Sequence, residues 1–126
     1  MSVLNTKRVY ERPARADGER FLVERLWPRG MKKEALAMKA WLKDIAPSDA
    51  LRRWFAHDPA KWDEFRRRYF AELAERGDAL RPILDASARG NVTLLYSAHD
   101  TEHNNAVALK EYLERPRARR ARRRAR

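Results

Sequence analysis

The chain of 126 residues contains no cysteine. Disulfides, thiolate catalysis and metal sites built from cysteine are therefore excluded, and a cysteine-free sequence suits the reducing cytoplasm. No apolar run approaches the roughly 20 residues that a membrane helix needs. The first residues, MSVLNTKRVYERPAR, also lack the apolar core of a signal peptide. We therefore expect a cytoplasmic protein without a membrane partner, and its length suits one domain.

Common cofactor motifs are absent as well. The chain has only four glycines, and they form neither a phosphate-binding loop nor a dinucleotide fingerprint. No serine stands in a nucleophile elbow, so ATP, NAD and acyl transfer by that route have no motif to support them. Residues 99–103, HDTEH, match the H-x-x-E-H pattern of some zinc peptidases. His99 precedes the expected helix and no third ligand is suitably spaced, so we expect no cofactor and no metal.

Acidic residues are scarce relative to basic ones, and the formal net charge is +11. Most of the excess lies in residues 115–126, RPRARRARRRAR, which contain eight arginines and no acid. We expect residues 1–114 to form the folded domain and residues 115–126 to be a disordered tail, because like charges repel and no large apolar residue is present. Such a tail could bind nucleic acid non-specifically through phosphate contacts, or it could be a dispensable extension.

The expected fold is organised around residues 92–113. The first five, VTLLY, are apolar or β-branched and lie between Asn91 and Ser97, which predicts a strand buried on both faces of a sheet. Polar residues follow, and Asp100 or Thr101 could cap a helix that begins there. In α/β sheets, ligands bind where loops leave the carboxyl ends of strands and helices begin. We therefore expect a site at this position.

The rest of the chain predicts an α/β fold. Two further strands are expected, at residues 7–11 and 21–26. Helical patterns with suitable caps or apolar spacing cover residues 38–46, 48–55, 59–76 and 78–89. A long helical crossover favours parallel strand pairing. We predict a single α/β domain with a small, mostly parallel sheet of about three strands, flanked by helices on both sides. The sequence leaves open whether the first two strands form a hairpin.

Five segments closely resemble the YeaO-like family of uncharacterised bacterial proteins, domain of unknown function 488. They are KRVYE, DGERFLVERLWPRG, WLKDIAPSDALRRWFAHDP, WDEFRRRYFAEL and VTLLYSAHDTEHNNAVALKEYL, within residues 7–113. The resemblance implies a compact α/β fold and no established biochemical activity. Automated labels have sometimes called members MarR-type transcriptional regulators. A winged helix-turn-helix needs a β-hairpin wing, and nothing after Ser48 is typical of one.

Charged and polar side chains follow two of the expected strands. Arg25 and Arg29 leave the second strand, while the third is followed by Ser97, His99, Asp100 and Asn104. If the two strands are neighbours, these groups converge on an anion pocket in which arginines hold a phosphate or carboxylate and Asn104 adds a contact. The alternative is a structural network, in which Arg25 pairs with Asp100 or Glu24 and Asp100 caps its helix.

Several of these groups could transfer protons. We take Ser97, His99 and Asp100 as the candidate catalytic residues, with Asp100 also orienting the anion. Lys43 joins Arg25, Arg29 and Asn104 as a candidate binding residue. Lys43 and Asp44, and the pair His57 and Asp58, could also reach the same face and exchange a proton near neutral pH.

Two functions follow from this sequence. The first is a protein that binds an anionic small molecule in an arginine-lined pocket, with the existence of a reaction left open. The second is a nucleic-acid-associated protein that acts through the basic tail. They differ in salt dependence, because binding through phosphate contacts weakens steeply as salt rises.

Overall fold

The computed structural model describes residues 2–115. Their strands form one parallel sheet in the order β1-β4-β2-β3. The strands are β1 (Leu4–Arg8), β2 (Glu19–Leu22), β3 (Ala40–Trp41) and β4 (Val92–Tyr96). The predicted α/β class with a small, mostly parallel sheet is confirmed, with four strands in place of about three.

Strand β4 lies at the centre of the sheet, as its composition predicts. It pairs with β1 from Leu4↔Val92 to Arg8↔Tyr96 and with β2 from Glu19↔Val92. All five of its residues are buried, because both faces of a central parallel strand are covered. The bounds of β4 match the sequence prediction.

The first two strands differ from their predicted positions. Strand β1 begins three residues early and ends at Arg8, because the chain then turns and the Glu11 N–H donates to the Arg8 carbonyl oxygen at 3.0 Å. Strand β2 ends at Leu22, four residues before the predicted end. The two strands do not form a hairpin, since β4 lies between them.

The predicted helix over residues 38–46 is wrong. Ala40 and Trp41 form β3, which pairs with Phe21 and Leu22, and a 3₁₀ turn follows at Lys43–Ile45. The apolar residues of this segment serve both faces of the sheet. Met38 and Trp41 pack on the cluster around Leu95, whereas Leu42 and Ile45 belong to the larger core. A single helical face cannot reach both clusters, so tertiary packing outweighs the helical spacing.

Helix α1 (Lys33–Leu36) was not predicted from the sequence. The other helices follow the predicted order: α2 (Asp49–Phe55), α3 (Trp62–Ala74), α4 (Arg81–Arg89) and α5 (Asn105–Leu113). Ser48 caps α2 as predicted, because its Oγ accepts from the Leu51 N–H at 3.2 Å. Helix α5 begins later than expected, and its cap is Asn104 in place of Asp100 or Thr101.

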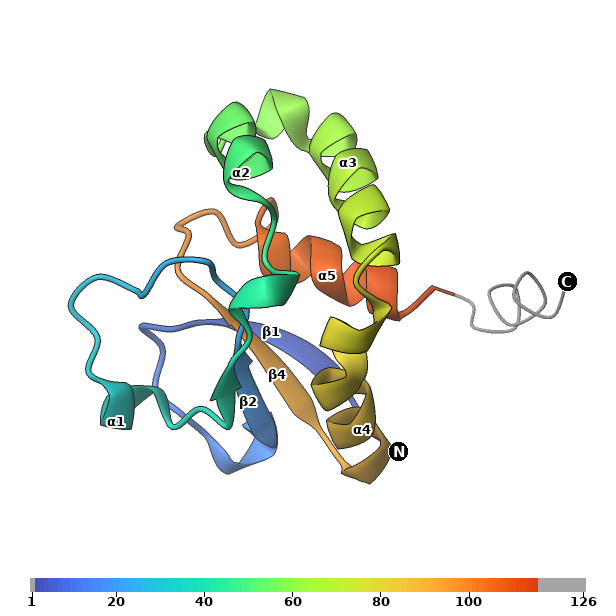
Figure 1. Cartoon of the computed structure of the whole chain (residues 1–126). Helices are drawn as coiled ribbons and strands as arrows, with labels where there is room; N and C mark the ends of the chain where they lie inside the picture. Colours follow the sequence, from blue (N-terminus) through green and yellow to red (C-terminus); the bar gives the residue numbers. More distant parts are fainter. Residues whose placement is uncertain (1, 116–126) are drawn as a thin grey trace, which may run out of the picture.

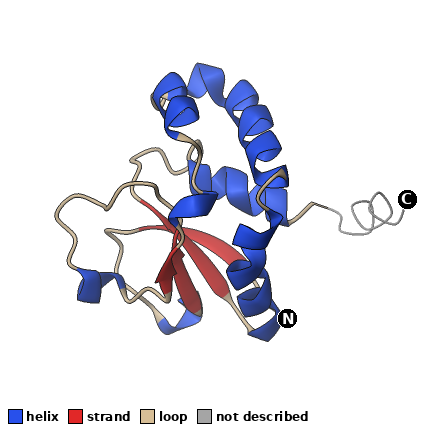
Figure 2. Ribbon diagram, in the orientation of Figure 1, coloured by secondary structure: helices blue, strands red, loops and turns tan. Residues whose placement is uncertain are grey.

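The two faces of the sheet are covered differently. Helices α2 to α5 supply most of the larger core, which includes Phe65, Tyr69 and Leu109 packed on Leu94. On the other face, loops and the short α1 cover a smaller cluster around Leu95. Figures 1 and 2 show the larger helices gathered on one side of the sheet and the loops with α1 on the other. Loops can therefore form an open site at the strand ends.

A buried charge network fixes the start of β2. Asp17 accepts from Lys7 at 3.1 Å and from Arg20 at 2.6 Å, and Arg20 is only 4% exposed. The next residue, Gly18, has a positive φ of 66° and lies against the Asn91 backbone. This turn ties β2 to the loop that precedes β4.

The expected tail begins with a residue that packs on the domain. The Arg115 guanidinium lies 5.4 Å from the Phe70 ring centroid and 5.6 Å from that of Tyr112. Such cation–π contacts hold Arg115 against α3 and α5. The rest of the expected tail, residues 116–126, lies outside the described residues.

Candidate functional site

A cavity of about 290 Å³ opens at the carboxyl ends of β2 and β4. Its wall combines apolar and polar residues from the β2 exit, the β4 exit, α2 and α5. The lining residues are Tyr10, Glu24, Arg25, Leu26, Trp27, Pro28, Arg29, Ala46, Pro47, Arg52, Phe55, His57, Phe65, Ser97, Ala98, Asn104 and Asn105. Small-molecule sites in α/β folds are typically of this kind and at this position.

Glu24 is held in the wall by contacts to its own backbone and to that of Val23. The Trp41 indole N–H donates to the Glu24 carbonyl oxygen at 2.6 Å, and the Val23 N–H donates to Leu95 at 3.2 Å. The Asn105 side chain donates to the Val23 carbonyl oxygen from α5. Three elements therefore fix the backbone from which the Glu24 side chain enters the cavity wall.

The carboxyl of Glu24 meets the first residue after β4. The Ser97 backbone N–H and the Ser97 hydroxyl each lie 3.4 Å from a Glu24 carboxyl oxygen. Burial raises the pKa of Glu24 to about 7, because a charged carboxylate is poorly solvated there; the Ser97 contacts and the charge of Arg52 only partly oppose this. Glu24 can therefore gain or lose a proton near neutral pH.

Three arginines line the same cavity. Arg25 donates from Nε to the Pro47 carbonyl oxygen at 3.1 Å and lies 3.7 Å from Asp49. Arg52 of α2 also approaches Asp49, at 3.4 Å, and its buried Nε has no hydrogen-bond partner among the described residues. Arg29 is exposed. The cavity lining thus contains three guanidinium groups and one carboxyl, that of Glu24, while Asp49 outside the lining pairs with Arg25 and Arg52.

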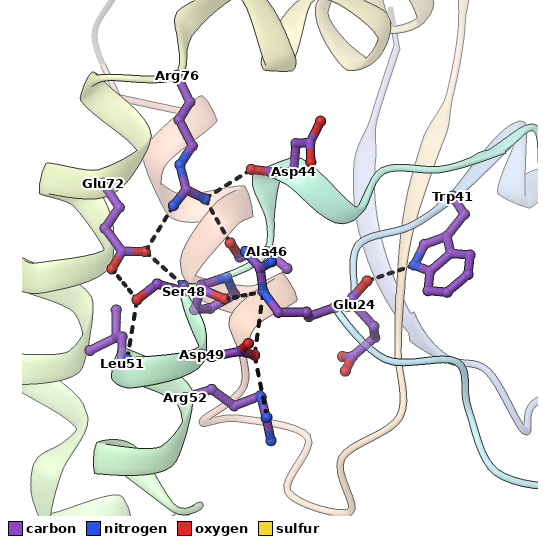
Figure 3. A network of polar contacts seen from close by, with 12 residues as sticks. Glu24, Trp41, Asp44, Ala46, Ser48, Asp49, Leu51, Arg52, Glu72 and Arg76 are labelled. Carbon is purple, nitrogen blue, oxygen red and sulfur yellow. Dashed lines mark hydrogen bonds and ion pairs between the residues drawn. The ribbon is translucent and has the colours of Figure 1, made fainter.

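A polar network anchors the part of the wall that leads into α2. Glu72 of α3 accepts from both the Ser48 N–H and the Ser48 hydroxyl, at 2.9 and 2.6 Å. Arg76 donates to the carbonyl oxygens of Asp44 and Ala46, each at 2.8 Å. Figure 3 shows these contacts beside Glu24 and Arg52. They fix the backbone that presents Arg52 to the cavity.

Asn104 lines the cavity, but both groups of its side-chain amide form hydrogen bonds within the fold. Its oxygen accepts from the Val107 N–H at 2.9 Å, and its nitrogen donates to the Asp100 carbonyl oxygen at 2.9 Å. An Asn at this position satisfies the free N–H groups of the first helical turn. The structure therefore assigns Asn104 to the start of α5, close to the cavity.

Three of the sequence-derived site residues lie away from the cavity lining. His99 is exposed, and the Asp100 carboxylate accepts from the N–H groups of Glu102 and His103 and contacts the His103 ring. These hydrogen bonds lower the pKa of Asp100. Lys43 is also exposed, and its ammonium lies 4.4 Å from the Trp41 ring centroid. The structure thus brings Arg25, Arg29, Ser97 and Asn104 together without His99, Asp100 or Lys43.

Of the pair His57 and Asp58, only one residue lines the cavity. His57 lines the cavity, whereas Asp58 caps the turn before α3 by accepting from the Ala60 N–H at 3.0 Å. Within residues 2–115 there is no cluster of three or more His, Asp or Glu side chains that could hold a metal ion.

Sequence reasoning missed the roles of Glu24 and Arg52 in the cavity. Glu24 follows the buried run FLV at the end of β2, and a single acid at such a position is a usable signal. Arg52 carries no comparable signal, because its approach to Glu24 depends on how α2 packs. Together with Arg25, Arg29 and Ser97, these residues can bind an anion and supply one proton-exchanging group.

The cavity lining lies within the part of the chain that matches a known protein family. A model of the family described as "Inactive DUF488-N3 subclade" matches residues 3–126. The chain belongs to the DUF488 family. The resemblance to the YeaO-like family seen in the sequence is thereby confirmed.

Relatives of this DUF488 chain are known in distant bacteria. Uncharacterized protein YeaO of Escherichia coli is 42% identical over 110 residues, which are 87% of this chain and 96% of YeaO. Uncharacterized protein Rv3073c of Mycobacterium tuberculosis is 38% identical over 106 residues, covering 84% of this chain and 89% of the relative. No solved structure matches the chain.

The length and polarity of the helices in this DUF488 protein bear on whether any of them could span a membrane. Each helix within residues 2–115 is too short or too polar to cross a membrane.

Proposed function

We propose that this protein binds an anionic small molecule, a phosphate or a carboxylate, in the cavity at the β2 and β4 exits, and that it does so in the cytoplasm. The observation that carries the proposal is the excess of guanidinium groups in the lining, which contains Arg25, Arg29 and Arg52 and a single carboxyl, Glu24. Arginine is well suited to this task because its planar fork matches the oxygens of carboxylate and phosphate.

The state of Glu24 supports binding of an anion. A half-buried carboxylate would repel a second negative charge, but a carboxyl with a pKa of about 7 can take up a proton when an anion enters. The cavity would then hold three cationic groups and a neutral hydrogen-bond donor. A volume of about 290 Å³ suits a compact metabolite.

The family description favours binding over catalysis. The model that matches the chain describes its subclade as inactive. Ser97 is the candidate catalytic residue that lies in the cavity, and its contacts with Glu24 are long, at 3.4 Å. Binding without turnover accounts for both observations.

A thermal-shift screen of the full chain tests this function. Inorganic phosphate, phosphorylated metabolites and dicarboxylates are added to the wild type, to Arg29→Ala and to Arg53→Ala. Arg29 is exposed and lines the cavity, whereas Arg53 is exposed on α2 and does not line it. A ligand present at 100 times its Kd stabilises the folded state by about 2.7 kcal/mol, which raises the melting temperature measurably.

The expected result is a shift in the wild type and in Arg53→Ala that Arg29→Ala loses. An equal shift in all three proteins would place the ligand elsewhere, and no shift with any anion would contradict the proposal.

Residues 117–126 support a second candidate function, non-specific nucleic-acid binding through the tail, because they contain seven arginines and no acid. Replacing these seven arginines with glutamine in the full-length chain should weaken retention on DNA or RNA and leave the anion-dependent thermal shift unchanged. Counterion release predicts that the tail-dependent binding falls steeply with salt.

A further inference from the structure

We infer that the folded domain carries its own binding surface for single-stranded nucleic acid, formed by residues 25–43 and the neighbouring Tyr10, and independent of the tail. We call residues 25–43 the basic segment. It contains six basic residues and one acid, Glu34. The surface overlaps the anion cavity at Tyr10 and residues 25–29, whereas its four lysines lie outside the cavity lining.

Charge is divided unevenly within the domain. Residues 1–43 contain eleven basic and five acidic residues, whereas residues 44–114 contain ten basic and thirteen acidic residues. The near neutrality of the domain as a whole therefore conceals a basic part and an acidic part. A polyanion is attracted to the first and repelled by the second.

The fold turns the cations of the basic segment towards solvent. Trp27, Met31, Leu36, Met38 and Trp41 pack on the smaller apolar cluster beneath the sheet. Five cations of the same segment are exposed: Arg29, Lys32, Lys33, Lys39 and Lys43. Figure 1 shows the loops and α1 of this segment on the side of the sheet away from α3 and α4. The segment that carries these cations thus lies on one side of the sheet.

Acidic neighbours do not neutralise this side. Among residues 2–115, no carboxylate lies within ion-pair distance of Arg29, Lys32, Lys33, Lys39 or Lys43. The arginines of α3 differ, because Arg66, Arg67 and Arg68 each pair with an acid at 2.9 Å or less. Unpaired surface cations are the groups that release counterions when they meet phosphates.

Exposed apolar side chains on the same side favour a single strand over a duplex. Tyr10 is 46% exposed and Leu26 is 59% exposed, and both stand in the wall of the cavity. The Tyr10 hydroxyl donates to the Arg29 carbonyl oxygen at 2.9 Å, which joins the aromatic ring to the basic segment. A single strand can place phosphates on the lysines and a base on Tyr10, whereas the bases of a duplex are already stacked.

The test measures binding of a fluorescent dT20 oligonucleotide to full-length chains in which the seven arginines of residues 117–126 are glutamine. One variant adds Lys32→Gln, Lys33→Gln and Lys39→Gln. A matched control adds Arg53→Gln, Arg81→Gln and Lys110→Gln, which remove the same charge from the helical side. Each phosphate contact on a single strand contributes about 0.7 to the salt slope.

The expected result is a salt slope about 2 lower for the lysine variant, and affinity weaker by up to about 100-fold at 0.1 M salt. The control should keep the parent affinity and slope within the smaller effect of long-range charge. If both variants lose the same affinity for dT20, binding depends on the net charge of the protein and not on this surface. If neither variant loses affinity, the three lysines make no phosphate contacts. Both outcomes would overturn the inference.

Two further probes test the kind of partner. Tyr10→Ala should weaken binding of dT20 by about fivefold or more, because a stacked base is lost, and should leave binding of inorganic polyphosphate unchanged. A 20-base-pair duplex should bind more weakly than dT20. If the duplex binds as tightly, or if Tyr10→Ala weakens both ligands alike, the surface does not select a single strand and the inference fails.

Discussion

The Glu24 carboxyl lies 3.4 Å from the Ser97 hydroxyl, across the carboxyl ends of two adjacent parallel strands. This contact joins the β2 exit to the β4 exit at the bottom of the arginine-lined cavity. It also places an acid with a pKa of about 7 where a ligand would enter.

Glu24→Gln should change how stability depends on pH. Burial raises the pKa of Glu24 from 4.5 to about 7, so the folded chain holds this proton more tightly than the unfolded chain does. The stability from Glu24 is therefore fully present below about pH 4.5 and is lost as the pH rises through 7. Between pH 5 and 8, the free energy of unfolding of the variant should gain about 2.5 kcal/mol relative to the wild type.

Urea unfolding at the two pH values measures this difference. Glu34→Gln is the control, because Glu34 is exposed on α1. A gap between Glu24→Gln and the wild type that is the same at pH 5 and pH 8 would show that Glu24 titrates at its ordinary pKa.

Asp17→Ala should be strongly destabilising. Asp17 holds Lys7 and Arg20, and the Arg20 side chain would be left charged and 4% exposed without its partner. Removing one partner of a buried ion pair costs about 3–5 kcal/mol. Denaturant unfolding should show this loss, while Asp85→Ala at an exposed position of α4 should stay within about 0.5 kcal/mol of the wild type. Similar values for the two variants would contradict the role of Asp17.

The same network predicts loss of stability in acid. Burial of Asp17 disfavours its charge, but hydrogen bonds from the Ala14 N–H, Lys7 and Arg20 outweigh this and lower the pKa of Asp17. A lowered pKa stabilises the fold above the pKa of the unfolded state, and this contribution disappears as the pH falls below it. Asp17→Asn should therefore unfold with a weaker dependence on pH below 4 than the wild type.

Two glycine substitutions should differ sharply. Both Gly18 and Gly30 have a positive φ, at 66° and 76°. A Cβ at Gly18 would lie 2.0 Å from the Asn91 carbonyl oxygen, whereas a Cβ at Gly30 has no neighbour within 4 Å. Gly30→Ala should cost about 1–2 kcal/mol from backbone strain alone. Gly18→Ala should cost several times more, or prevent folding, as measured by circular dichroism and thermal melting; equal costs would mean that the Asn91 loop moves aside freely.

Tyr69→Phe should show how much one buried hydrogen bond contributes to the free energy of unfolding. The Tyr69 hydroxyl donates to the Ile45 carbonyl oxygen at 2.5 Å, and Tyr69 is fully buried. The substitution leaves that carbonyl without its partner, which costs about 1–3 kcal/mol. Tyr10→Phe is the comparison, because its hydroxyl bonds to Arg29 at a half-exposed position and should cost less. Urea unfolding of both variants at one pH measures whether Tyr69→Phe loses more unfolding free energy than Tyr10→Phe.

Local sequence was sufficient for elements whose partners lie nearby in the chain. The run VTLLY predicted β4, since a five-residue apolar stretch between breakers suits a strand that is covered on both faces. Ser48 predicted the start of α2, because the capping bond is made to the Leu51 N–H three residues later. The arginines at 25 and 29 were placed at a strand exit for the same local reason.

Tertiary structure decided what depends on distant contacts. Residues 38–46 have helical spacing, yet pairing with β2 and packing on both faces of the sheet make a strand of Ala40 and Trp41. Asp100 was expected to cap a helix and instead caps a turn before it, because Asn104 supplies the cap of α5.

The sequence by itself determined the family, the α/β class, the central strand and the position of the arginines, because each can be recognised from short stretches of neighbouring residues. Only the tertiary structure decided that Glu24 is half-buried beside Ser97 and that Arg52 shares its cavity, since residues 24, 52 and 97 meet through the order of the strands and the packing of α2. The charge that a carboxyl carries at neutral pH depends on that burial, and burial is a property of the folded chain.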